Sequence, residues 1–213
     1  MASSLAAVPG RRQLQKQDRE RRILAAARSL FDRNGYAKTS MEDVAERAGL
    51  AVGTLYNYFR SKDDLLLAIM RREADRLLRI AEGIVADPPH DAVVAIAAMA
   101  DLFVESISAD ERMLWRELFA ASIGSPQDLG ARLLELDMQI VAQLSALLEK
   151  MKTQGSIAAD LDQSETAMTI YGVCIAWALA FVTNETITVD AMSTGIAGAI
   201  RMMVRGLLPR LEA

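Results

Sequence analysis

Residues 39–62, with the sequence TSMEDVAERAGLAVGTLYNYFRSK, constrain the fold more than any other part of the chain. Thr39 is expected to cap a first short helix, and Glu42, three residues later, completes a capping box. Gly49 stands where a left-handed residue ends a helix, and residues 53–59 are expected to form a second short helix. Two helices joined by a short glycine-containing turn form a helix-turn-helix, whose second helix enters the major groove of DNA.

The same segment resembles the DNA-binding domain of the tetracycline-repressor (TetR/AcrR) family of bacterial transcriptional regulators. The matching positions are Thr39-Ser40, Val44-Ala45, Ala48-Gly49-Leu50, Gly53-Thr54-Leu55-Tyr56, Phe59 and Lys62. The close match covers roughly residues 18 to 67, and beyond it the resemblance rests on length and helical character. It implies an all-α protein of about nine helices, with an N-terminal three-helix head and a C-terminal helical domain that binds a ligand and dimerises.

Charge is divided unevenly along the chain. Residues 1–72 hold 14 Lys or Arg against 8 Asp or Glu, a net charge of +6, whereas residues 73–213 hold 10 against 20, a net charge of −10. A basic segment at one end is typical of a protein that binds the phosphates of DNA there. The alternative is a solvated run of charges on the first helix.

The sequence argues against secretion and membrane insertion. The N-terminus MASSLAAVPG lacks the charged start and apolar core of a signal peptide. The longest charge-free apolar stretch, residues 167–182, is shorter than the roughly 20 residues that span a bilayer, so a buried helix explains it better. The single cysteine, Cys174, excludes an internal disulfide. We therefore expect a cytoplasmic protein without membrane association.

No pattern in the sequence indicates catalysis. His90, the only histidine, has the position of an exposed residue at a helix start, and Cys174 lies among apolar residues, where a thiol is usually unreactive. Metal-ligand clusters, nucleophile elbows and phosphate-binding loops are not found in the sequence. We expect no enzyme activity, no metal and no cofactor.

The chain is expected to divide into three parts. Residues 1–15 are predicted to form a flexible arm, residues 16–62 the DNA-binding domain with its helix-turn-helix at 39–58, and residues 63–213 the helical effector-binding and dimerisation domain. The predicted helices outside the helix-turn-helix cover about 18–34, 62–86, 91–108, 110–121, 127–153, 164–182 and 190–207. The residues of the long helix predicted to face inward are Leu66, Ile69, Met70, Leu77, Ile80 and Ile84. Residues 186–189 could pass for a strand but are read as a loop.

Five residues are candidates for contacts with the DNA backbone. Thr39 and Ser40 are expected to present hydroxyls and a helix N-terminus to a phosphate. Gly53 lacks a side chain and so lets the second helix approach the duplex. Tyr56 and Lys62 match family positions that the resemblance implies touch phosphates. The alternatives are core packing for Tyr56 and a solvated surface position for Lys62.

Four further residues are candidates for contacts with base edges, because asparagine pairs with adenine and apolar groups meet the thymine methyl. They are Val52, Thr54, Asn57 and Tyr58. Leu55 and Phe59 are expected to face inward. The chain departs from the family at Ala51, where a capping serine is usual, and at Tyr58, where histidine is usual; core packing is the alternative for Tyr58.

A palindromic operator is read by two heads about one helical turn apart, roughly 34–36 Å, so the resemblance implies a homodimer on double-stranded DNA. A stripe of small residues on the last two helices is the candidate interface: Gly172, Ala176, Ala180, Gly195 and Ala199. The alternative is packing of the same stripe within one chain.

Large or soft side chains of the C-terminal domain are candidates for a pocket, which in the family holds a small, often hydrophobic effector. They are Phe103, Trp115, Phe119, Met138, Tyr171, Cys174 and Trp177. Each could instead belong to the core.

The expected function is therefore a ligand-responsive transcriptional regulator, a repressor that an effector releases from its operator through different affinities for two conformations. The alternative is a helical interaction or ligand-binding protein without specific DNA readout.

Overall fold

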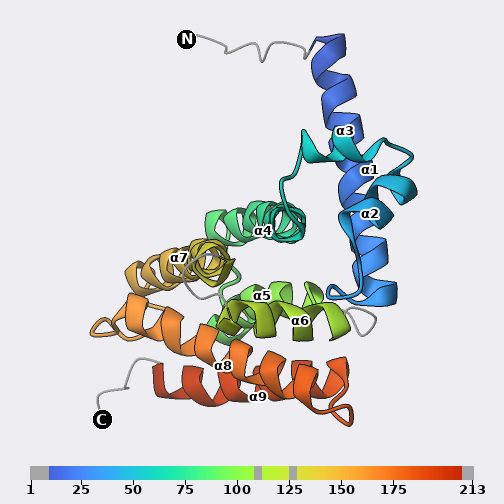
Figure 1. The fold of residues 1–213 in the computed structure, drawn as a ribbon. Helices are drawn as coiled ribbons and strands as arrows, with labels where there is room; N and C mark the ends of the chain where they lie inside the picture. The colour runs from blue at the N-terminus through green and yellow to red at the C-terminus, as the bar shows by residue number, and fades with distance from the viewer. Residues whose placement is uncertain (1–9, 108–111, 125–128, 208–213) are drawn as a thin grey trace, which may run out of the picture. The chain divides into compact units, whose positions relative to one another are not determined.

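The computed structural model describes residues 10–107, 112–124 and 129–207. Within these ranges the chain forms nine helices, and none of the described residues lies in a strand (Figure 1). The helices are α1 Arg11–Asn34, α2 Met41–Ala48, α3 Val52–Tyr56, α4 Lys62–Ala86, α5 Ala92–Glu105, α6 Arg112–Gly124, α7 Ala131–Thr153, α8 Gln163–Thr183 and α9 Val189–Leu207. The predicted all-α fold is confirmed, and residues 186–188 lie in the loop before α9.

Helix α1 begins earlier than predicted. It starts at Arg11, so that residues 11–15, expected in a flexible arm, are helical; residues 1–9 lie outside the described part of the chain. The segment RRQLQKQD consists mostly of good helix formers, and its side chains are exposed. The predicted start of the helix was based on its buried apolar residues, the first of which is Ile23. Residues 11–18 are exposed and show no apolar periodicity, so the sequence pattern did not reveal that they are helical.

The chain divides into two compact units, Met1–Ile69 and Met70–Ala213. The boundary lies inside α4, seven residues beyond the predicted division after residue 62. The first turns of α4 therefore belong to the N-terminal unit, called the head below, and the rest of α4 belongs to the C-terminal unit, called the body.

In the head, α1 packs against α2 and α2 against α3. The cap of α2 differs from the prediction by one residue: Ser40, not Thr39, is the N-cap, and Asp43, not Glu42, completes the capping box. The Asp43 N–H donates to Ser40 Oγ at 3.1 Å, and the Ser40 N–H donates to Asp43 Oδ2 at 2.8 Å. Gly49 ends the helix with φ 66°, in the left-handed region as predicted.

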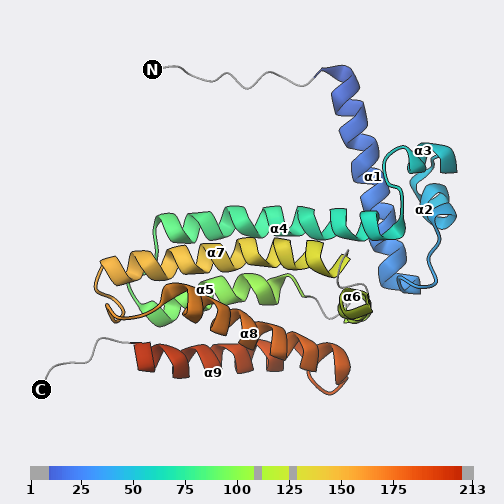
Figure 2. The same cartoon turned by 60° about the vertical axis from the view of Figure 1, so that its left-hand side comes forward.

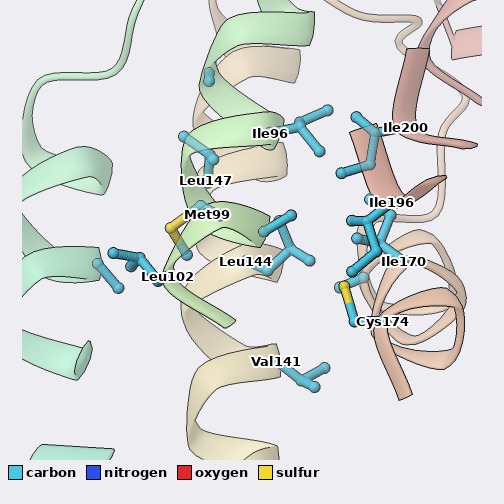
Figure 3. Packing of buried hydrophobic residues seen from close by; sticks show 14 of the residues in the cluster. Ile96, Met99, Leu102, Val141, Leu144, Leu147, Ile170, Cys174, Ile196 and Ile200 are labelled. Carbon is cyan, nitrogen blue, oxygen red and sulfur yellow. The ribbon is translucent and has the colours of Figure 1, made fainter. Parts of the chain in front are cut away.

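The core of the body is built by four helices. Helix α7 packs against α5 and α8, and α9 packs against α5 and α8. Figure 2 shows α8 and α9 side by side. Figure 3 shows side chains from α5, α7, α8 and α9 meeting, among them Ile96, Leu144, Ile170 and Ile200. This apolar contact accounts for the long hydrophobic runs in the sequence.

The predicted inward face of α4 is correct except at one position. Leu66, Ile69 and Leu77 are buried, whereas Ile80 is exposed and Ala81 is buried in its place. With about 100° of rotation per residue, Ala81 lies closer to the direction of Leu77 than Ile80 does. Alanine is only weakly hydrophobic, so the sequence pattern favoured Ile80 over Ala81 as the inward-facing residue.

Helix α8 is, among the described residues, the one helix long and apolar enough to span a membrane by length and composition. In the structure it packs against α6, α7 and α9 and buries Ala167, Ile170, Cys174, Ala178, Phe181 and Val182. This packing accounts for its apolar composition.

Two arginines of α6 bind the carbonyl end of α8. The Arg112 guanidinium donates to the carbonyls of Phe181, Asn184 (3.0 Å) and Ile187 (2.7 Å), and its central carbon lies 3.7 Å from the centroid of the Phe181 ring. Arg116 Nε donates to the Val182 carbonyl at 2.9 Å. Because the last carbonyls of a helix lack partners within the helix, these cations satisfy them and complement the helix dipole.

Candidate functional site

Helix α3, the candidate reading helix, is short. It spans Val52–Tyr56 rather than residues 53–59, and Ala51 precedes it without a side-chain cap, as the departure from the family predicts. Asn57 is its C-cap, and Tyr58 follows in the turn. Helix α4 begins a few residues later, at Lys62, and the Asp64 N–H in its first turn donates to Ser61 Oγ at 3.1 Å.

The two faces of this segment divide as predicted. Leu55 is 0% exposed, and Phe59 is also buried. Val52, Gly53 and Asn57 are exposed, and Thr54 and Tyr58 are half-buried. Tyr56 is 45% exposed, which rules out core packing for its side chain. The structure thus brings six of the nine candidate DNA contacts into one surface segment, residues 52–58.

Thr39 does not belong to this surface. Its side chain is 2% exposed, and its hydroxyl donates to the Gly35 carbonyl at 2.9 Å. This burial contradicts the prediction that Thr39 presents its hydroxyl to a phosphate. Ser40 is half-buried, and its hydroxyl donates to Asp43 Oδ2 at 2.6 Å within the capping box. The hydrogen bonds from the Ser40 side chain and backbone lower the pKa of Asp43.

Lys62 is bound inside the head. Its Nζ donates to the carbonyls of Tyr36 at 2.8 Å and Ala37 at 3.3 Å, and it lies 4.6 Å from the centroid of the Tyr36 ring. The Tyr36 hydroxyl donates to the Asp63 carboxylate. The start of α4 is therefore held to the loop before α2, and the reading of Lys62 as a solvated surface lysine is wrong. Its contact with a phosphate remains a prediction.

The body contains a cavity of about 120 Å³. Four of the seven predicted pocket residues line it: Phe103, Trp115, Phe119 and Tyr171. Met138, Cys174 and Trp177 do not. Cys174 is buried in the core (Figure 3), and burial raises the pKa of its thiol to about 12, as expected for an unreactive cysteine.

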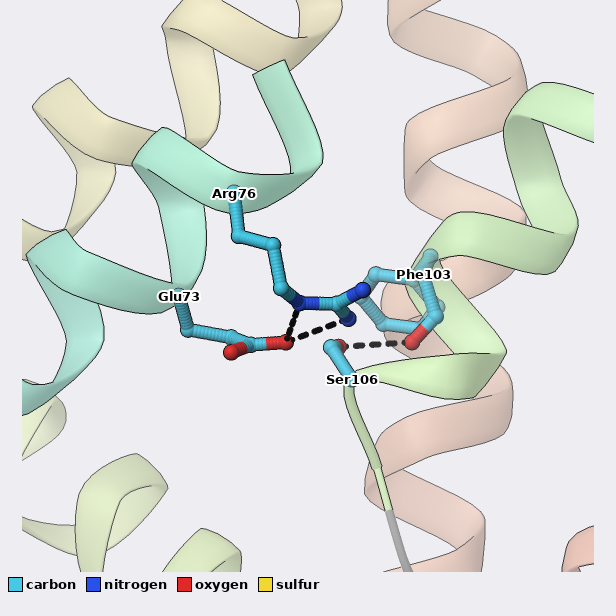
Figure 4. Close-up of polar contacts among 4 residues, drawn as sticks. All are labelled: Glu73, Arg76, Phe103 and Ser106. Atoms are coloured by element: carbon cyan, nitrogen blue, oxygen red, sulfur yellow. Dashed lines mark hydrogen bonds and ion pairs between the residues drawn. The ribbon is translucent and has the colours of Figure 1, made fainter. Parts of the chain in front are cut away.

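Polar groups around the cavity were missed by the sequence prediction, which considered only large and soft side chains. They are Glu73 of α4, Ser106 after α5, Ser122 of α6 and Asp137 of α7. Figure 4 shows Glu73 paired with Arg76, whose Nε and Nη2 donate to Glu73 Oε1 at 3.0 and 2.6 Å. A signal existed for Asp137: it lies four residues after Leu133, on the same helical face.

Asp137 and Tyr171 form a polar pair at the cavity wall. The Tyr171 hydroxyl donates to Asp137 Oδ2 at 2.6 Å. Burial raises the pKa of the Asp137 carboxyl, and the bond from Tyr171 opposes this in part. Burial and the neighbouring carboxylate raise the pKa of Tyr171. A carboxylate held in an apolar cavity is typical of a binding site rather than of a core built for stability.

Asp137→Asn is expected to raise the free energy of unfolding of the body at neutral pH. Because the pKa of Asp137 is higher in the folded than in the unfolded chain, wild-type stability is lost as pH rises through the folded-state pKa. Asparagine does not ionise, and its carbonyl oxygen still accepts a hydrogen bond from Tyr171. Urea unfolding at several pH values should show a gain that disappears at acidic pH, below the ordinary pKa of aspartate. An equal gain at every pH would contradict this explanation.

The small-residue stripe behaves differently on its two helices. On α8, Gly172 and Ala176 are exposed and Ala180 is half-buried. On α9, Ala199 is half-buried, and a Cβ atom added to Gly195 would lie 2.1 Å from the Trp177 indole. Gly195 is thus explained by packing within the chain, whereas Gly172 and Ala176 remain open on the surface.

Comparisons with known proteins agree with this organisation. The model of the family described as "Bacterial regulatory proteins, tetR family" matches residues 23–69. The HTH-type transcriptional regulator UidR of Escherichia coli (strain K12) is 28% identical over 201 residues, covering 92% of this chain and 96% of UidR. The HTH-type transcriptional repressor KstR of Rhodococcus jostii is 47% identical over 62 residues, 29% of each protein.

A solved structure extends the likeness to the whole fold. The transcriptional regulator FadR from Bacillus subtilis, in complex with stearoyl-CoA, superposes with a TM-score of 0.71 at 20% identity and covers 88% of this chain and 98% of FadR. The family model thus matches the segment that contains the helix-turn-helix, whereas the similarity in fold includes the helical body.

Proposed function

The chain belongs to the tetR family of bacterial regulatory proteins, and from this premise we propose that it is a repressor that binds a palindromic operator as a homodimer and is released by a small apolar effector. The observation that carries the proposal is the exposed segment 52–58 supported from beneath by buried Leu55 and Phe59. The relatives are named as transcriptional regulators, and KstR is named as a repressor. A role as a cytoplasmic protein without enzyme activity is part of the same proposal.

The segment has the chemistry for reading DNA. Asn57 is exposed and offers both an amide donor and a carbonyl acceptor to a base edge, and exposed Val52 offers an apolar surface to a thymine methyl. Exposed Gly53 leaves room for close approach to the sugar-phosphate backbone. We propose that Tyr56 contacts phosphate, since the residue is 45% exposed and the head carries net positive charge.

A dimer interface on α8 is part of the proposal. Met168 and Leu179 are exposed on this helix beside Gly172 and Ala176. Small residues let two helices approach closely, and the two apolar side chains add area that is removed from water. A dimer through this face presents two heads to two half-sites.

The effector site of the proposal is the cavity of the body. FadR, which has a similar fold, was solved in complex with stearoyl-CoA, and this supports the proposal that the present chain responds to a ligand. Met70, Glu73 and Leu77 of α4 line the cavity, and Lys62 and Asp63, at the start of the same helix, bind Tyr36 in the head. A ligand that changes the position of α4 therefore acts on a helix that is anchored to the reading head, and it shifts operator affinity by its differential affinity for the two states.

The test is selection of bound duplexes from a random pool, followed by titration of the selected operator at several salt concentrations. Asn57→Ala is expected to relax preference at individual base pairs, at a cost of about 1–3 kcal/mol at the correct sequence. Lys62→Ala is expected to weaken binding to all sequences alike, because its ammonium binds the Tyr36 and Ala37 carbonyls and so holds the start of α4 to the loop before α2.

A decrease of about 0.9 in the magnitude of the salt slope for Lys62→Ala would assign it the predicted phosphate contact, and an unchanged slope would limit it to this structural role. If the wild-type protein selects no sequence at low salt, the chain is a helical interaction or ligand-binding protein without DNA readout, and the proposal fails.

A further inference from the structure

The three hydroxyl groups around the cavity each donate their hydrogen to an acceptor within the protein. Ser106 Oγ donates to the Phe103 carbonyl at 2.7 Å (Figure 4), and Ser122 Oγ donates to the Leu118 carbonyl at 2.8 Å. The Tyr171 hydroxyl donates to Asp137. A hydroxyl has one hydrogen to give and two lone pairs to accept with. Toward the cavity, all three groups therefore offer only acceptor positions.

The two carboxylates add further acceptors. Both hydrogen bonds from Arg76 go to Oε1 of Glu73, and the bond from Tyr171 goes to Oδ2 of Asp137. Among the described residues, no other side chain donates a hydrogen bond to these two carboxylates. Oε2 of Glu73 and Oδ1 of Asp137 can therefore accept a hydrogen bond from a ligand. The described lining contains no Lys, Arg or His, and the indole N–H of Trp115 is its one remaining side-chain donor.

This arrangement selects for one chemistry. An anionic ligand would meet the Asp137 carboxylate, a Glu73 carboxylate that is paired with Arg76, and one neutral donor, and burial of its charge beside Asp137 would be unfavourable. A ligand that brings its own donor can pair with these lone pairs. The cavity of about 120 Å³ is similar in size to an engineered apolar cavity of about 150 Å³ that holds benzene.

We propose that the cavity binds a small apolar molecule that carries a hydrogen-bond donor, either a hydroxyl or a protonated amine, and no anionic group, and that Asp137 accepts the bond. The proposal rests on the proposed function only in naming this molecule the effector. Binding itself is measured without DNA.

The experiment uses calorimetric titration of the full chain with three probes that share one aromatic body: benzyl alcohol, benzylamine and phenylacetate. The alcohol and the amine are expected to bind at least about tenfold more tightly than phenylacetate, the scale of one hydrogen bond to a charged group. Phenylacetate binding as tightly as either, or no binding by any probe, overturns the proposal. Because the three affinities are compared on the wild-type chain, the result does not depend on whether a variant folds.

Asp137→Asn identifies the accepting group. The variant is expected to bind benzylamine about tenfold more weakly and phenylacetate more tightly, because the asparagine amide donates to a carboxylate. Glu135→Gln is the matched control: it removes one charge from an exposed position of the same helix outside the cavity and should leave all three affinities within about twofold. Equal effects of the two substitutions would show that net charge, not Asp137, sets the preference.

The ligand class and the regulatory role of the cavity are tested separately. If the probes follow the expected order but none of them changes operator affinity, the cavity chemistry stands and the regulatory role of the site fails. If the operator is bound and the probe order is reversed, the function stands and the ligand class is wrong.

Discussion

Phe181→Ala is expected to lower the free energy of unfolding of the body by about 3–5 kcal/mol. The Phe181 side chain is 0% exposed and lies under the Arg112 guanidinium. Truncation leaves a cavity in the core and also removes the aromatic surface on which the cation rests. Both tryptophans of the chain, Trp115 and Trp177, lie in the body, so urea unfolding followed by tryptophan fluorescence reports on this unit.

Leu179→Ala is the control for this measurement. Leu179 lies on the same helix but is 45% exposed, so its truncation removes little buried surface from one chain. We expect a change within about 0.5 kcal/mol under conditions that keep the protein monomeric. A loss for Leu179 equal to that for Phe181 would mean that the described packing of α8 is wrong.

The helix-turn-helix could be predicted because its signals are local. Gly49 ends α2 with a left-handed backbone, and Leu55 and Phe59 mark one face of a single short segment. The choice of cap could not be predicted from the capping pattern alone. Both Thr39 and Ser40 have a capping side chain, and Ser40 holds the position because the Thr39 hydroxyl is buried against the Gly35 carbonyl, a partner outside the capping pattern.

The cavity could be predicted only in part because it depends on which helical faces meet. Trp115 and Phe119 were found by size alone, but Trp177 is just as large and packs on Gly195 instead. Asp137 was missed because its role depends on a partner, Tyr171, that is 34 residues away in the chain. Helical periodicity places a residue on a face of its own helix; it does not say which other helix that face contacts.

Leu55→Ala is expected to abolish operator binding while the body stays folded. The side chain is fully buried beneath α3, and its truncation costs about 2–5 kcal/mol. The head is a small unit, and small units have a stability of only roughly 0.05–0.15 kcal/mol per residue, so this loss is a large fraction of the total. Hydrogen exchange should show loss of protection in α2 and α3, and tryptophan fluorescence should not change.

Leu14→Ala makes the comparison specific, because it is the same substitution in the same unit at a site that is 50% exposed in α1. It should leave protection in α2 and α3 unchanged. Wild-type operator affinity for Leu55→Ala would mean that α3 does not read DNA or does not need its buried anchor. Loss of body fluorescence in that variant would mean that the two units unfold together, and a defect in operator binding could then no longer be assigned to the head.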